Sequence, residues 1–190
     1  MERTKVRVKR FAIVFMAVGA LTAALAVPAL AVNTVTQQLN GGTRTASIAD
    51  ATLPALTYAH TDQTNPGTLN LTADDSTGTG AGWNVTVQSS NFVYSGANSG
   101  TDIPAANFAL TSAAAPTSTA GQAVNATGGP AAGVQTGTLD SALMVLEANA
   151  NFGQGTYTQD LGVELTVPGM SRAGTYTGTL TVTIAAGPAV

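Results

Sequence analysis

The 190-residue chain contains no cysteine and a single histidine, His60. Without cysteine, structural zinc sites, iron–sulfur clusters and thiol nucleophiles lose their usual ligand or reactive group. A lone histidine makes a poor metal site, and no Gly-x-Ser-x-Gly turn supplies a serine for it to activate. We therefore predict no enzymatic activity, no metal site and no cofactor.

Positive charge is scarce outside the N-terminus. Five of the seven Lys and Arg residues lie within residues 1–10, and only Arg44 and Arg172 follow. Residues 32–190 carry these two basic residues and nine acidic ones, which gives a formal net charge of −7. Such a surface cannot neutralise a phosphate backbone and has no basic patch for anionic lipid. We expect no nucleic-acid partner.

The N-terminus has the three parts of a secretory signal peptide. Basic residues 1–10 precede an apolar stretch over 11–27, and the small residues that follow form an Ala-x-Ala site ending at Ala31. We predict cleavage after Ala31, so that residues 1–31 are removed and residues 32–190 form one domain. An uncleaved membrane anchor is the alternative, because the apolar stretch is near the lower length limit for a spanning helix. No second stretch of that length follows.

The remaining residues show the period-two pattern of β-strands. Over residues 174–185, Tyr176 and three aliphatic residues share one parity, and threonines occupy the other. Residues 159–167 alternate in the same way. A Pro-Gly pair follows at 168–169, so we predict that these two segments are antiparallel neighbours joined by a loop.

Many other short segments are typical of strands separated by turns. Residues 83–87 form a third clear candidate, and residues 143–148 favour a buried strand over a short helix. Residues 73–82 and the low-complexity excursion over 112–137 are predicted loops. The fold class is therefore all-β, an antiparallel β-sandwich of Ig-like or jelly-roll-like type. Weaker strand candidates lie at 35–39, 45–48, 56–58, 68–72 and 107–110.

Acidic residues offer two weak hypotheses for chemistry. Asp74 and Asp75 precede a Gly-rich stretch and could, with Asp62 or Asp102, offer oxygen ligands to calcium, but their spacing matches neither the EF-hand pattern nor the nonapeptide repeat. A solvated turn is the favoured interpretation. The only glutamates after residue 31 are two isolated ones, and nothing places them across a cleft as in a glycosidase.

Trp83 is the only tryptophan of the chain. Its position at the start of a strand favours a core anchor, since large aromatic side chains fill sandwich interiors. The functional alternative is a platform on which a sugar ring stacks. We name Trp83 as the first candidate binding residue and Tyr176 as the second.

Two short motifs stand out, Gly-Trp-Asn-Val-Thr-Val at 82–87 and Gly-Thr-Tyr-Thr-Gly-Thr-Leu-Thr-Val-Thr-Ile at 174–184. They resemble the WxL domain family of cell-surface proteins from Gram-positive bacteria. The resemblance extends over roughly residues 39–188. Val85 stands where the first motif has Leu, and Val182 stands where the second motif has Trp.

The resemblance implies an exported cell-surface protein that associates non-covalently with cell-wall peptidoglycan, beside other surface proteins and in adhesion. The last strand is also similar to that of pilin-like subunits that assemble by strand exchange, which gives the alternative function. A calcium-dependent adhesin and a secreted hydrolase are less favoured. After processing, we expect no membrane span.

Overall fold

The computed structural model describes residues 34–133 and 135–188. The predicted signal peptide and its cleavage site after Ala31 lie outside these residues. The chain divides into two units, Met1–Gln38 and Leu39–Val190, and the following description concerns the second unit. No helix in the described part of the chain is long and apolar enough to cross a bilayer.

Two antiparallel strands of 13 residues each form the centre of the larger sheet. They pair with each other along their whole length, and two shorter strands follow one another along the far edge of β10. Two further short strands complete the sheet. Its strands are β1 (Arg44–Ile48), β2 (Gln63–Asp75), β10 (Gly155–Val167), β5 (Phe108–Ala113), β6 (Thr117–Gly121) and β8 (Gly137–Thr138).

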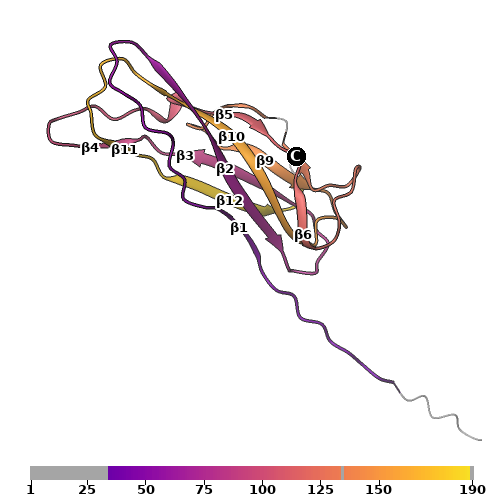
Figure 1. The fold of residues 1–190 in the computed structure, drawn as a ribbon. Coiled ribbons are helices and arrows are strands. Elements are labelled where there is room, and N and C mark those ends of the chain that lie inside the picture. Colours follow the sequence, from indigo (N-terminus) through magenta and orange to yellow (C-terminus); the bar gives the residue numbers. More distant parts are fainter. Residues whose placement is uncertain (1–33, 134, 189–190) are drawn as a thin grey trace, which may run out of the picture. The chain divides into compact units, whose positions relative to one another are not determined.

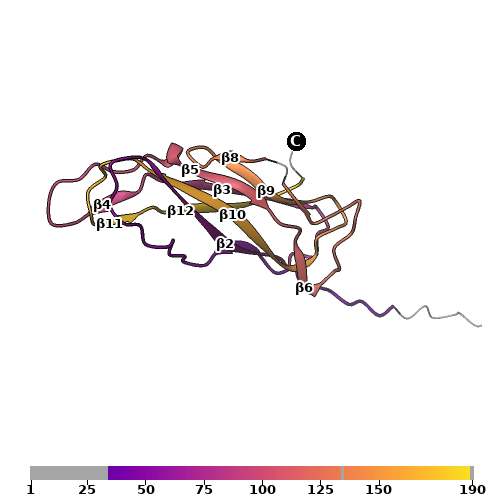
Figure 2. The same ribbon diagram turned by 45° about the horizontal axis from the view of Figure 1, so that its top comes forward.

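A smaller sheet provides the second layer of the sandwich, and a two-stranded ribbon extends one end. The views in Figures 1 and 2 both place this ribbon, formed by β4 and β11, at the opposite end of the unit from β6. A single 3-10 turn, Ala105–Asn107, precedes β5. The smaller sheet has the order β12 (Leu180–Ala186), β3 (Trp83–Ser89), β9 (Leu143–Ala148) and β7 (Ala131–Ala132), and the ribbon pairs β4 (Val93–Ser95) with β11 (Thr175–Thr177).

The core lies between the two sheets and is built from alternate residues of their strands. In β3 and β10 the buried positions follow period two, as the sequence predicts for strands with one face inward. The buried aromatic residues include Trp83 and Tyr157, whose ring centroids are 6.0 Å apart. The all-β antiparallel sandwich is therefore confirmed.

One polar side chain is buried among these apolar residues and connects the two sheets. Gln159 of β10 donates from Nε2 to the carbonyl oxygen of Ala114 at 2.8 Å and to that of Val145 in β9 at 3.0 Å. Ala114 lies in the interruption between β5 and β6. The Gln159 Oε1 atom has no hydrogen-bond partner among the described residues.

The predicted pairing of residues 159–167 with residues 174–185 is wrong. The second segment consists of two strands, β11 and β12, and β12 pairs with β3 in the smaller sheet, whereas β10 pairs with β2, β5 and β6 in the larger one. The connection after β10 therefore passes from one layer to the other. Alternation reports which face of a strand is buried, but it does not specify the neighbouring strand.

Other predicted elements differ in outcome. Residues 143–148 form strand β9, and the weaker candidates at 45–48, 68–72 and 107–110 correspond to β1, β2 and β5, whereas 35–39 and 56–58 form no strand. The two predicted loops are only partly irregular. Residues 73–75 end β2, and the excursion over 112–137 contains β6 and β7 together with the buried residues Pro116 and Pro130.

Candidate functional site

Trp83 lies in the core. Its side chain is fully buried, and its indole Nε1–H donates to the carbonyl oxygen of Gly153 at 2.8 Å. Gly153 has a φ of +77°, and a Cβ atom there would lie 2.7 Å from the indole nitrogen, so a larger residue has no room. Of the two interpretations of Trp83, the structure therefore matches the core anchor. In this structure the ring has no exposed face on which a sugar could stack.

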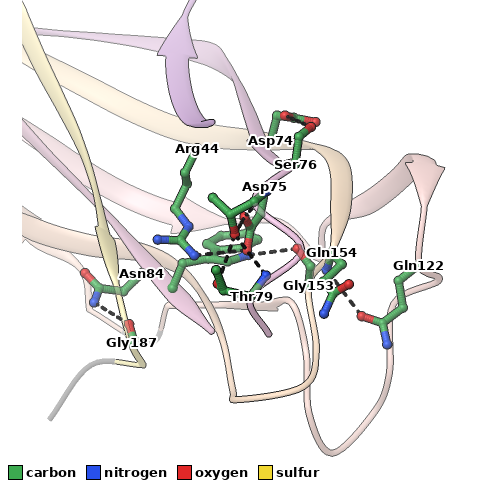
Figure 3. Close-up of polar contacts among 12 residues, drawn as sticks. Arg44, Asp74, Asp75, Ser76, Thr79, Asn84, Gln122, Gly153, Gln154 and Gly187 are labelled. Atoms are coloured by element: carbon green, nitrogen blue, oxygen red, sulfur yellow. Dashed lines mark hydrogen bonds and ion pairs between the residues drawn. The ribbon is translucent and has the colours of Figure 1, made fainter. Parts of the chain in front are cut away.

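A largely buried ion pair between Arg44 and Asp75 connects β1 to the end of β2 (Figure 3). Arg44 Nη2 is 3.1 Å from Asp75 Oδ2, and the Thr77 hydroxyl and backbone N–H donate to Asp75 Oδ1 at 2.6 and 3.1 Å. Burial raises the pKa of Asp75, but the hydrogen bonds from Thr77 and the charge of Arg44 outweigh it, so the net pKa is lowered. Burial, followed by the charge of Asp75, raises the pKa of Tyr157. These contacts hold β1 and residue 77 to the end of β2, which is a structural role.

The same contacts bear on the weak calcium hypothesis. Asp74 accepts hydrogen bonds from Ser76 at 2.6 Å and Thr156 at 2.7 Å, while the carboxylate of Asp75 faces Arg44. In the part of the chain that the structure describes, no three His, Cys, Asp or Glu side chains form a group that could hold a metal ion. Asp62 and Asp102 each accept a backbone N–H elsewhere, from Gly169 and Tyr94 respectively.

A hollow lies at the end of the sandwich that carries β4 and β11. It has a volume of about 640 Å³ and is lined by residues 51–59, by the end of β10 and by residues 171–178. Tyr176, the second candidate from the sequence, lines it. An adjoining hollow of about 500 Å³ shares Tyr58, Arg172 and Ala173 with the first and adds Tyr94, Asn98 and Met170.

Two tyrosines of the ribbon fix the loop at this end. The rings of Tyr94 in β4 and Tyr176 in β11 are 5.2 Å apart between centroids and tilted by 54°. Their hydroxyls donate to successive carbonyls of the loop, from Tyr94 to Ala173 at 3.1 Å and from Tyr176 to Arg172 at 2.9 Å. The hydroxyls are thus engaged within the domain, so a ligand in the hollows would meet these two side chains at the accessible parts of their rings.

The position of the Tyr94 ring depends on nearby glycines. A Cβ atom on Gly100 would come within 2.6 Å of the ring, and one on Gly174 would come equally close. Any side chain at either position would push the ring away, so glycine at both positions lets the Tyr94 ring pack against the backbone. This places it beside Tyr176.

Several exposed apolar side chains surround the two hollows. Tyr58 is 55% exposed and Met170 is 68% exposed, and both line the second hollow, while Leu56 lines the first. The ring of Tyr58 meets that of His60 edge-on, with centroids 5.2 Å apart. We call this region the tyrosine face and define it as Leu56, Tyr58, Tyr94, Met170, Arg172 and Tyr176.

The tyrosine face was mostly missed by sequence reasoning. Only Tyr176 was named, because it falls in the terminal period-two segment. Tyr58, Tyr94 and Arg172 lie in separate segments with no common spacing, and only the fold brings them together. The number of tyrosines is a faint signal of this face, since three of the four in the chain line the two hollows.

The two sequence motifs, by contrast, lie on adjacent strands of the smaller sheet. Strand β3 holds the first motif and β12 the end of the second, and Ala186 pairs with Trp83 while Val182 pairs with Val87. A comparison with protein families matches residues 26–188 to the model described as WxL domain surface cell wall-binding. The chain belongs to the WxL family. Comparisons with curated proteins and with solved structures give no match.

Membership establishes the class of function. The WxL domain is a surface domain that binds the cell wall, so this chain is a wall-associated protein of the cell surface. The family is one of wall-binding proteins and not an enzyme family. The resemblance drawn from the two motifs is thereby confirmed.

Proposed function

We propose that this WxL domain binds peptidoglycan non-covalently and that the tyrosine face is the contact. The observation that carries the proposal is the gathering of Tyr58, Tyr94 and Tyr176 around two adjoining hollows. Ligand sites are typically concave and lined by aromatic and apolar side chains with a few polar groups. The C–H face of a pyranose ring is apolar and packs against an aromatic ring, while its hydroxyls remain free to bind water or polar groups.

The distribution of exposed apolar residues supports the same face. Among the described residues, large exposed apolar side chains are few, and Leu56, Tyr58 and Met170 all line the two hollows. Exposed apolar residues that cluster indicate a binding surface, whereas scattered ones do not. Val124, which is 41% exposed and does not line either hollow, is an isolated example and serves as a control position.

The test is co-sedimentation of purified residues 32–190 with isolated Gram-positive sacculi. Tyr58→Ala is the most informative variant, because Tyr58 is exposed and its removal should leave the melting temperature unchanged. We expect wild type and Val124→Ala to pellet with the sacculi and Tyr58→Ala to remain largely in the supernatant. A second variant, Tyr176→Leu, removes a ring from the first hollow. If both tyrosine variants pellet like the wild type, the tyrosine face is not the contact.

Assembly by strand exchange, the alternative function, has less support. In pilin-like subunits a neighbour supplies a strand that the fold lacks. Here β12 pairs with β3 over all seven of its residues, and β3 has β9 on its other side. The C-terminal strand is thus used within its own domain.

A further inference from the structure

Arg172 is the cation of the tyrosine face. It lines both hollows, its side chain is exposed, and its guanidinium makes no hydrogen bond or ion pair with any other described residue. The only other arginine after residue 31, Arg44, is partly buried and pairs with Asp75. Among the described residues Arg172 is therefore the one arginine without an ion pair, and it stands among the tyrosines.

The backbone that carries Arg172 is fixed on several sides. Besides the two tyrosine hydroxyls on carbonyls 172 and 173, Met170 N–H donates to the carbonyl of Ala59 at 2.9 Å, and Gly169 N–H donates to Asp62 at 2.8 Å. A cation on a fixed backbone loses less conformational entropy when it binds than one on a mobile loop. Only the side chain of Arg172 must become ordered.

The charge of the rest of the domain makes this position selective. With a net charge of −7 over residues 32–190, the domain as a whole repels an anionic ligand, and the exposed Arg172 offers it a local attraction. The two carboxylates near the tyrosine face, Asp62 and Asp102, already accept backbone N–H groups and lie beyond ion-pair distance of Arg172. They would still repel a ligand with many negative charges. The site therefore suits a ligand with a sugar ring and a single nearby carboxylate.

We propose that Arg172 binds a carboxylate of the glycopeptide, so that the domain recognises acidic muropeptide units and not neutral glycan chains. The inference rests on the proposed function and names the ligand class of the tyrosine face. Peptidoglycan offers suitable groups in the carboxylates of its peptide stems, next to the sugar that carries each stem. The planar guanidinium accepts a carboxylate in a two-point hydrogen-bonded pair, and the tyrosine rings hold the adjacent sugar.

The experiment measures binding of residues 32–190 to three soluble probes by calorimetry. They are a disaccharide tetrapeptide with free carboxylates, the same muropeptide with its carboxylates amidated, and chitotetraose as a neutral glycan. We expect amidation to weaken binding to the wild type by at least about tenfold, because a charge-assisted hydrogen bond is lost. Arg172→Gln should bind both muropeptides equally weakly, Arg172→Lys should keep part of the preference, and binding of chitotetraose should be the same in all of them.

Ala120→Glu is the matched control. It lowers the net charge by one unit, as Arg172→Gln does, but it lies in β6 at the other end of β10. It should keep the full preference for free carboxylates. If Ala120→Glu loses the preference as Arg172→Gln does, overall charge and not a contact at Arg172 accounts for it, and the inference is overturned.

Two further results would overturn the inference while leaving the proposed function intact. One is equal affinity of the wild type for the free and amidated muropeptides, with Tyr58→Ala still defective on sacculi. The other is tighter binding to a glycerol phosphate polymer than to the free muropeptide, which would assign Arg172 to phosphodiesters. Failure of the proposed function looks different, because then Tyr58→Ala pellets with sacculi as the wild type does.

Discussion

Replacing Trp83 by alanine tests whether the tryptophan of the first motif serves the fold. The side chain is fully buried, packs beside Tyr157 and donates to Gly153, so its removal opens a cavity and leaves a buried carbonyl without its donor. Truncation of a buried Trp to Ala costs about 3–5 kcal/mol of unfolding free energy. The lost hydrogen bond places the expected value toward the upper end of that range.

This loss should be large in a thermal melt. For a domain of this size, each kcal/mol lowers the melting temperature by about 2–4 °C, so we expect a decrease of about 6–20 °C. Trp83→Phe keeps a ring in the cavity but loses the hydrogen bond, and its unfolding free energy should lie between those of the wild type and Trp83→Ala. The order of the three proteins is as informative as the size of the loss.

The assay is urea unfolding followed by far-UV circular dichroism. Fluorescence cannot be used, because Trp83 is the only tryptophan and the variants lack it. If Trp83→Ala unfolds within about 0.5 kcal/mol of the wild type, as a surface substitution would, the core assignment is refuted. An exposed Trp83 ring on which a sugar stacks would then be the better interpretation.

Three more predictions concern polar contacts within the domain. Folding lowers the pKa of Asp75, so the stability that its carboxylate provides is present above the ordinary pKa of 3.8 and is lost as the pH falls through the folded pKa. Asp75→Asn should therefore lower the unfolding free energy by about 3 kcal/mol at pH 7. In urea titrations the loss should become progressively smaller below pH 3.8. Gln159→Leu should lower the unfolding free energy by about 1–3 kcal/mol, because the carbonyl of Ala114 loses its donor and that of Val145 keeps only the Gly133 N–H; an unchanged urea midpoint would contradict this. Tyr94→Phe keeps the ring but releases the carbonyl of Ala173, so sacculus binding should weaken modestly while Tyr94→Ala abolishes it; equal binding by both would show that the ring is not a contact.

The fold class could be predicted from the sequence because alternation survives in long strands. In β10 and β12 the apolar residues fall on one parity, and the structure turns that parity toward the core. The pairing of strands could not be predicted in the same way. Pro168 and Gly169 indicate a turn but not that the chain crosses to the other sheet, and only the packing of the two layers decides this.

The candidate site was harder to predict for a related reason. Trp83 attracts attention because it is unique, yet uniqueness says nothing about exposure. The tyrosine face combines Tyr58 from a segment without regular structure, Tyr94 from a three-residue strand and Arg172 from a loop. None of these segments has a pattern of its own, and the hydroxyl-to-carbonyl contacts that assemble them span 79 residues of chain in the case of Tyr94 and Ala173.

The position of the two motifs changes how their departures should be interpreted. If the tryptophans of such motifs were wall contacts, a chain with Val182 in place of the second one would bind the wall less well. In this structure the first motif lies on β3 and the second ends on β12, where Trp83 is buried, Val182 pairs with Val87, and alternate side chains of both strands pack against the core. Val at position 182 is therefore a change in packing, and β-branched residues suit strands well. The motifs identify the fold, whereas the proposed wall contact takes only Tyr176 from them, and its other residues come from segments that the motifs do not contain.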